Sequence, residues 1–273
     1  MELSFDDREA LLRAKLVLEH PGLATKITDL VGFPIERGLA ALPLGMQRAI
    51  AATTAAALRI ALHAAISTLV EAPGSSASPK LHKLAAGIAG AAGGFFGLLA
   101  LPAELPLSTL IILRSIADVA RSEGEDMQSM EARLACLAVL GLGSDHARHI
   151  EPAVETGYYA ARIGFAQTMT QAAEHIAKHG MAKKLAPPVA EFLSRVAARF
   201  STRVSEELIA KAIPVVGAAS GAAINTLFMH HFQEMAKAHF TVRRLERSYG
   251  LSHVKRAYEG VHWHDGRSSI ANA

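Results

Sequence analysis

The stretch that decides the fold is Leu84-Ala-Ala-Gly-Ile-Ala-Gly-Ala-Ala-Gly-Gly-Phe-Phe-Gly-Leu-Leu-Ala-Leu-Pro-Ala103, which carries no charged residue. Its glycines include two GxxxG pairs, Gly90 with Gly94 and Gly93 with Gly97. Glycine and alanine remove side-chain bulk, so two helix backbones can approach closely, either in lipid or in a protein core. The stretch therefore predicts a tightly packed helix at the centre of the protein.

A second uncharged stretch, at 212–229, has the same character. It reads Ala-Ile-Pro-Val-Val-Gly-Ala-Ala-Ser-Gly-Ala-Ala-Ile-Asn-Thr-Leu-Phe-Met, with a GxxxG pair at Gly217 and Gly221 and with Asn225 as its most polar residue. No window of the chain alternates apolar and polar residues between turn signals, as strands do. We therefore expect an all-α protein, a single helical domain built around two glycine-rich apolar helical hairpins, with little or no β-structure.

The composition agrees with helices. Hydrophobic residues make up 51% of the 273 residues, but aromatic residues only 5%. The apolar content is thus mainly alanine, leucine, valine and isoleucine, and alanine and leucine are strong helix formers whereas aromatic residues favour strands.

Apolar periodicity and capping residues outline the individual helices. Pro102 and Pro106 lack the backbone N–H that a helix interior needs, so we expect them to interrupt or kink the chain there. Asp126 is expected to cap the helix that follows. The predicted helices cover 6–20, 23–31, 45–71, 107–123, 127–140, 150–179, 187–210 and 212–249.

The length of the first glycine-rich stretch, twenty residues, meets the criterion for a membrane-spanning helix. Its seven strongly apolar residues contribute only about −2 to −4 kcal/mol to insertion, which one central charge would cancel. Two interpretations remain open. The stretch is either a buried hairpin inside a helical domain or a glycine-zipper hairpin that enters or lies in a membrane.

The cysteine content bears on the compartment. Cys136 is the only cysteine and lies in an apolar helical stretch, which excludes an internal disulfide and indicates a reducing compartment and an inert, buried thiol. The N-terminus has neither the basic nor the apolar region of a secretory signal. We expect a cytoplasmic protein.

Two long motifs carry a family resemblance. Leu101-Pro-Ala-Glu-Leu-Pro-Leu-Ser-Thr-Leu-Ile-Ile-Leu-Arg-Ser-Ile-Ala-Asp-Val-Ala-Arg-Ser-Glu-Gly-Glu-Asp126 resembles the central motif of the EcsC family, and Ile213-Pro-Val-Val-Gly-Ala-Ala-Ser-Gly-Ala-Ala-Ile-Asn225 resembles its C-terminal motif. The resemblance extends over about residues 10–250. It divides the chain into an N-terminal arm (1–9), an EcsC-like helical domain (10–250) and a polar C-terminal tail (251–273).

The resemblance implies a bacterial, helical, intracellular protein that works near the membrane, and it implies no particular reaction. The mild net charge of +3 is compatible with an anionic membrane surface. We expect a non-enzymatic protein that associates peripherally with the inner face of the cytoplasmic membrane or with a membrane protein such as a transporter. The sequence leaves oligomerisation open.

The alternative is an enzyme, hydrolase-like, or a small-molecule or lipid-binding protein. Its candidate catalytic residues are Glu104, Arg114 and Asp118, since a carboxylate in an apolar pocket can act as a general acid or base. If Glu104 and Arg114 are buried they must pair with each other, and Arg114 and Asp118 share a helix face. Asn225 is expected to hold helices together, at a contact formed with Gly217 and Gly221.

Other chemistries find less support. The 13 histidines form only two-ligand clusters, so no metal site and no cofactor are predicted. A basic helical stretch at 239–247 is expected to be a solvated face, with contact to anionic lipid as the alternative. Nucleic acid is not an expected partner, because the stretch lacks interleaved aromatic residues and any recognised motif.

Overall fold

The protein was examined as a computed structural model, and this structure describes residues 3–19, 22–32, 34–69, 97–142, 157–181, 185–212, 218–264 and 267–270. In these ranges the chain is a helical bundle that ends in a two-stranded antiparallel hairpin, which confirms the all-α prediction. The elements are α1 (Phe5–Glu19), α2 (Leu23–Val31), α3 (Ile35–Ala40), α4 (Leu44–Thr68), α6 (Gly97–Ser122), α7 (Met130–Val139), α8 (Gly157–His179), α9 (Pro187–Ala212), α10 (Ala218–Tyr249), α11 (Leu251–Gly260), β1 (Val261–His264) and β2 (Arg267–Ile270).

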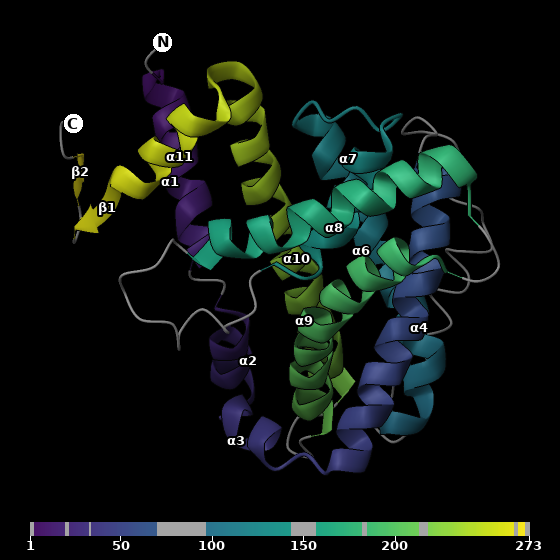
Figure 1. Ribbon diagram of the computed structural model, residues 1–273. Helices are drawn as coiled ribbons and strands as arrows, with labels where there is room; N and C mark the ends of the chain where they lie inside the picture. The colour runs from purple at the N-terminus through teal and green to yellow at the C-terminus, as the bar shows by residue number, and fades with distance from the viewer. Residues whose placement is uncertain are drawn as a thin grey trace.

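The longest helix, α10, organises the bundle. It packs against α1 and α6 and also touches α2, α7, α9 and α11. Figure 1 shows α10 in the middle of the molecule, with α1 and α11 at its C-terminal end and α2 and α3 toward the opposite end. Helix α4 packs against α6 on one side and α9 on the other, and α8 lies across α9.

The core combines small aliphatic side chains with clusters of aromatic rings. Alanines on α4, such as Ala57 and Ala61, are fully buried and allow α6 to pack close. Phe200 of α9 meets Phe228 and Phe232 of α10 in edge-to-face and tilted ring contacts. Such ring geometries add to the stability gained from burial alone.

One close approach requires a glycine. A Cβ on Gly141, just after α7, would lie 2.7 Å from the Phe165 ring and 3.4 Å from the backbone of Val196. Helices α8 and α9 therefore pack directly onto the backbone at the end of α7.

Several sequence predictions are corrected. Pro102 and Pro106 do not interrupt the chain, because α6 is one continuous helix through both. Pro102 and Pro106 are the sixth and tenth residues of α6, so each removes one intrahelical hydrogen bond, and the packing of α6 against α4 and α10 keeps the helix continuous despite that loss. The N-cap of α7 is Ser129, whose side chain accepts from the Ala132 N–H, and Asp126 instead shapes the preceding turn.

The C-terminal region is also more ordered than its polar composition suggests. Residues 251–260, expected to begin a polar tail, form α11, in which Val254 and Tyr258 are fully buried. The amphipathic pattern of this short helix was not recognised in the sequence.

The two glycine-rich hairpins stay a prediction. Residues 84–96 and 213–217 lie outside the described residues, and α6 and α10 begin directly after them. The prediction for Cys136 is confirmed in that the thiol is buried, and burial raises its pKa to about 12.

Candidate functional site

Glu104, the leading candidate from the sequence, lies on α6 and faces the last turn of α9. The ammonium Nζ of Lys211 lies 2.7 Å from Glu104 Oε1 and 2.8 Å from Glu207 Oε1. These three residues are called the Lys211 cluster below. The cluster sits at the C-terminal end of α9 and the N-terminal part of α6, beside the points where the two glycine-rich stretches join the described helices.

The expected pair of Glu104 with Arg114 is wrong. Because α6 is continuous, a separation of ten positions places the two residues about 15 Å apart along one helix axis. Arg114 is exposed, and Lys211 takes its place as the cation beside Glu104.

The charges of the Lys211 cluster do not balance. Burial raises the pKa of Glu207, and the attraction of Lys211 offsets this only in part. Burial would lower the pKa of Lys211, but Glu207 and Glu104 together raise it above its ordinary value. Two carboxylates thus share one ammonium group. Lys211 therefore stays protonated, and Glu207 gains a proton at a higher pH than an ordinary glutamate does.

A second ion pair lies one turn earlier on α9. Arg203 Nη1 contacts both carboxylate oxygens of Glu206 at 2.9 and 2.8 Å, and both side chains are almost completely buried. A buried pair of this kind is expensive to desolvate and very destabilising to break. The sequence run Arg-Val-Ser-Glu-Glu signals these charges, but only the packing of α9 reveals their burial.

The remaining predicted residues do not join this cluster. Asp118 is exposed and bonds Arg121 at 2.6 Å instead of Arg114. Asn225 is exposed on α10, so the described helices do not bury it between them. Gly221 lies within α10, and Gly217 lies outside the described residues.

A larger charged centre lies at the other end of the molecule, where the turn after α6 meets the C-terminal half of α10. Arg243 binds Glu125 through two nitrogens at 2.8 and 3.0 Å, and Arg244 Nε lies 2.9 Å from Glu123. Gly124 between the two carboxylates adopts a left-handed φ of 77°. This arginine cluster comprises Glu123, Glu125, Lys237, Arg243, Arg244 and Arg247.

In the arginine cluster the basic side chains outweigh the effect of burial on the pKa values of the carboxylates. Burial would raise the pKa of Glu123 and of Glu125, but hydrogen bonds and charges from their basic partners hold both pKa values below the ordinary range. The basic stretch 239–247 was expected to be a solvated face, with lipid contact as the alternative. Its arginines instead pair with the acidic side chains of this cluster, and Arg244 and Arg247 stay partly exposed. In the sequence, the acidic motif Glu123-Gly-Glu125 could have indicated these ion pairs, because its charge is opposite to that of the arginines.

A third polar centre is aromatic. Tyr158 Oη lies 2.9 Å from Nδ1 of the buried His239, and burial lowers the pKa of that imidazole well below its usual value. Nearby, Arg162 binds Glu246 through both terminal nitrogens at 2.7 and 2.6 Å. Burial raises the pKa of Tyr158 to about 12. The centre holds a neutral imidazole and a protonated phenol, and it links α8 to α10.

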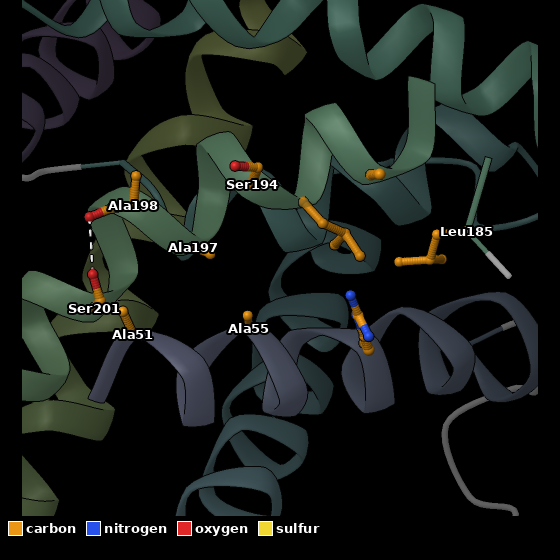
Figure 2. A pocket seen from close by; sticks show the side chains of 10 residues that line it. Ala51, Ala55, Leu185, Ser194, Ala197, Ala198 and Ser201 are labelled. Carbon is orange, nitrogen blue, oxygen red and sulfur yellow. Dashed lines mark hydrogen bonds between the residues drawn. The ribbon is translucent and has the colours of Figure 1, made fainter. Parts of the chain in front are cut away.

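A shallow, half-open hollow lies elsewhere, along the seam between α4 and α9. Its volume is about 380 Å³. Figure 2 shows Ala51 and Ala55 of α4 below Ser194, Ala197, Ala198 and Ser201 of α9, with Leu185 at one end. We call it the α4/α9 groove, and its walls are formed by Ala51, Ala55, Arg59, Leu185, Ala190, Leu193, Ser194, Ala197, Ala198 and Ser201.

The described residues can be assessed for metal binding and for helices able to cross a membrane. Among the described residues no group of three or more His, Cys, Asp or Glu side chains is placed to hold a metal ion. Within the same residues, α4 is the one helix whose length and apolar composition would suffice to cross a membrane, with a mean hydropathy of 1.6 and 39% of its apolar window buried inside the protein.

Comparison with known proteins identifies the family of the chain. No curated protein and no solved structure matches it. The model of the EcsC protein family matches residues 40–245, from the end of α3 to the last turns of α10. This range includes both charged clusters except Arg247. The match covers most of the chain and agrees with the resemblance of the two motifs in α6 and at the start of α10. The chain therefore belongs to the EcsC protein family.

Proposed function

We propose that this protein is non-enzymatic and associates peripherally with an anionic membrane surface through the outer face of α4. The observation that carries the proposal is the composition of this helix. Its 25 residues include Arg48, Arg59 and His63 but no aspartate or glutamate. Less than half of its apolar window is buried by the rest of the protein.

The exposed side of α4 combines cations with apolar side chains. Leu44 and Ile60 are 69% and 45% exposed, and Arg48 and Arg59 lie on the same exposed side as several alanines. An apolar surface with basic residues and no acidic ones is suited to the interface of a membrane that contains anionic lipids.

The other side of α4 argues for surface contact over insertion. Ile50, Leu58 and Leu62 are buried against the neighbouring helices α6 and α9. Moving α4 into a bilayer would uncover the apolar surfaces of α6 and α9 that it covers, at a cost of about 1.5–3 kcal/mol for each large apolar side chain left in water. Contact along the outer face leaves the core intact and gives weak, reversible binding.

The membrane concerned is proposed to be the inner face of the cytoplasmic membrane. The single buried thiol supports a reducing compartment, in which this face is the accessible one. The Lys211 cluster supports no hydrolytic reaction here, because Glu104 and Glu207 are both engaged by Lys211 and neither lines the α4/α9 groove.

Vesicle sedimentation tests the proposal. We expect the protein to bind vesicles that contain anionic lipid and not vesicles of neutral lipid, with binding that falls as salt is raised. Each arginine near such a surface contributes about 1 kcal/mol, so Arg48→Gln should weaken binding about fivefold.

The matched control is Arg13→Gln, which removes the same charge from an exposed pair on α1, away from α4. It should leave vesicle binding nearly unchanged. Equal binding to neutral and anionic vesicles, or an equal loss in both variants, would refute a role for the outer face of α4.

A further inference from the structure

We propose that His63 makes the membrane contact of α4 dependent on pH, so that the protein binds an anionic membrane more tightly as the pH falls. This inference rests on the membrane association proposed above and adds the regulation of that same surface. It is carried by the position of His63 on α4, by the charges of the helix and by the surroundings of the imidazole.

His63 lies on the exposed stripe of α4 that carries the arginines. Arg48, Ala52, Ala56, Arg59 and His63 follow one another at intervals of four, four, three and four positions, and all five residues are exposed. Residues at such intervals lie along one face of a helix. His63 is thus about 6 Å along the helix axis from Arg59 and about 22 Å from Arg48. The surface that presents the two arginines also presents the imidazole.

The charge of this stripe depends on the state of the histidine. Histidine is the side chain whose charge ordinarily changes between pH 5 and pH 8. Because α4 contains no aspartate or glutamate, protonation of His63 adds a third cation that no acidic residue of the helix offsets. An anionic membrane surface attracts protons as well as arginines, so contact with it favours the protonated imidazole.

The neighbouring helices leave the imidazole without a competing partner. Helices α6, α7 and α9 pack against α4. Their exposed charged residues are Arg114, Asp118, Glu131, Glu191 and Arg195. Asp118 is paired with Arg121, and Glu191 is paired with Arg195. Within the described ranges the His63 side chain forms no hydrogen bond or ion pair, so its charge is available to a membrane.

Vesicle sedimentation at pH 7.5 and pH 5.5 tests the proposal. The vesicles consist of phosphatidylcholine with phosphatidylglycerol, whose phosphodiester keeps its negative charge at both pH values. We expect the unmodified protein to bind about fivefold more tightly at pH 5.5, the gain that one added cation provides near an anionic surface.

Two variants of the exposed His63 separate its charge from other effects of pH. His63→Gln cannot be protonated, so it should bind at both pH values about as the unmodified protein does at pH 7.5. His63→Lys is charged throughout and should bind at pH 7.5 about as tightly as the unmodified protein at pH 5.5. Thermal unfolding checks that both variants are folded.

His253→Gln is the matched control, since Figure 1 shows α11, which carries His253, on the opposite side of the molecule from α4. It should keep the gain in binding at pH 5.5. A gain that persists in His63→Gln, or one that His253→Gln loses to the same extent, overturns the proposal. Equal binding of the unmodified protein at the two pH values overturns this inference alone, whereas absence of binding at both overturns the membrane association as well.

Discussion

The arginine cluster and the Lys211 cluster lie at opposite ends of the bundle and neutralise their carboxylates to different extents. Both place two carboxylates in buried or half-buried positions on or beside α6, and both recruit cations from a later helix. The arginine cluster supplies four cations for two carboxylates, whereas the Lys211 cluster supplies one. The ratio decides the direction of the pKa changes, downward for Glu123 and Glu125 and upward for Glu207.

The difference shows which end of the bundle is stabilised by its ion pairs. In the arginine cluster each carboxylate is more stable ionised than in water, so the cluster stabilises the fold at neutral pH. In the Lys211 cluster the ionised form of Glu207 is less stable than in water. The first cluster joins α6 to α10 firmly, and the second leaves residual negative charge where α6 and α9 meet.

The largest expected effect comes from removing the centre of the arginine cluster. Glu125→Met strands Arg243, whose side chain is 18% exposed, and removes a partner of Arg247. Loss of one partner of a buried ion pair typically destabilises by 3–5 kcal/mol, and the partial exposure of the arginines favours the lower end, about 3 kcal/mol. Urea unfolding at pH 7 measures the change in the free energy of unfolding.

Asp118→Asn is the matched control, because it breaks a more exposed ion pair on α6, the helix that ends just before Glu125. Its effect should be under about 0.5 kcal/mol. If Glu125→Met behaves like this control, the arginine cluster is not the tie between α6 and α10.

A smaller loss is expected at the Lys211 cluster. Lys211→Met should destabilise by about 2 kcal/mol at pH 7, since it leaves Glu104 and Glu207 without their shared cation. The pKa of Glu207, already raised, would rise further. Protonation then relieves the repulsion, so the loss should shrink between pH 7 and pH 5. A loss that is the same at both pH values contradicts the cluster as described.

The smallest expected effect concerns the pH range in which each cluster changes its contribution to the free energy of unfolding. Because burial raises the folded-state pKa of Glu207 above 4.5, its ionisation penalty is present at high pH and disappears as the pH falls through that pKa. The stabilising contributions of Glu123 and Glu125 are lost only below their ordinary pKa, as the pH falls through their lowered values. Between pH 7 and pH 5 the two effects do not overlap.

Glu207→Gln should therefore change the free energy of unfolding at pH 7 by less than about 1 kcal/mol, while removing the gain in stability that the unmodified protein shows on going to pH 5. Urea unfolding at the two pH values measures both quantities. An unchanged pH dependence in this variant would assign the titration to another group.

The sequence predicted the fold better than the candidate site. The helix of α2 was predicted at its observed bounds, since Gly22 and Gly32 flank a short amphipathic run. The prolines of α6 led to a wrong prediction of a break, because the packing of this helix against α4 and α10 outweighs the two missing hydrogen bonds. Glu104 was singled out from the sequence and is half-buried in the structure, but its partner Lys211 is 107 residues away and no local pattern connects them.

The arginine cluster shows the same limit. Its acidic and basic motifs were both visible, yet their meeting depends on how α6 and α10 pack. The α4/α9 groove was not predicted at all, since an alanine-rich helix reads as a close-packing surface. Only the actual spacing of α4 and α9 shows that the alanines there leave a hollow.

The docking of α1 has a consequence for synthesis of the protein. Asp7 of α1 bonds Arg244 and Tyr249 of α10, and Glu19 bonds Tyr258 of α11. The first helix thus finds its partners only after about 240 further residues have been translated, roughly 10–50 s at the rates of cellular synthesis. Throughout that interval the apolar face formed by Leu11 and Leu18 lacks its main partner, α10, so this face stays exposed longer than the rest of the core.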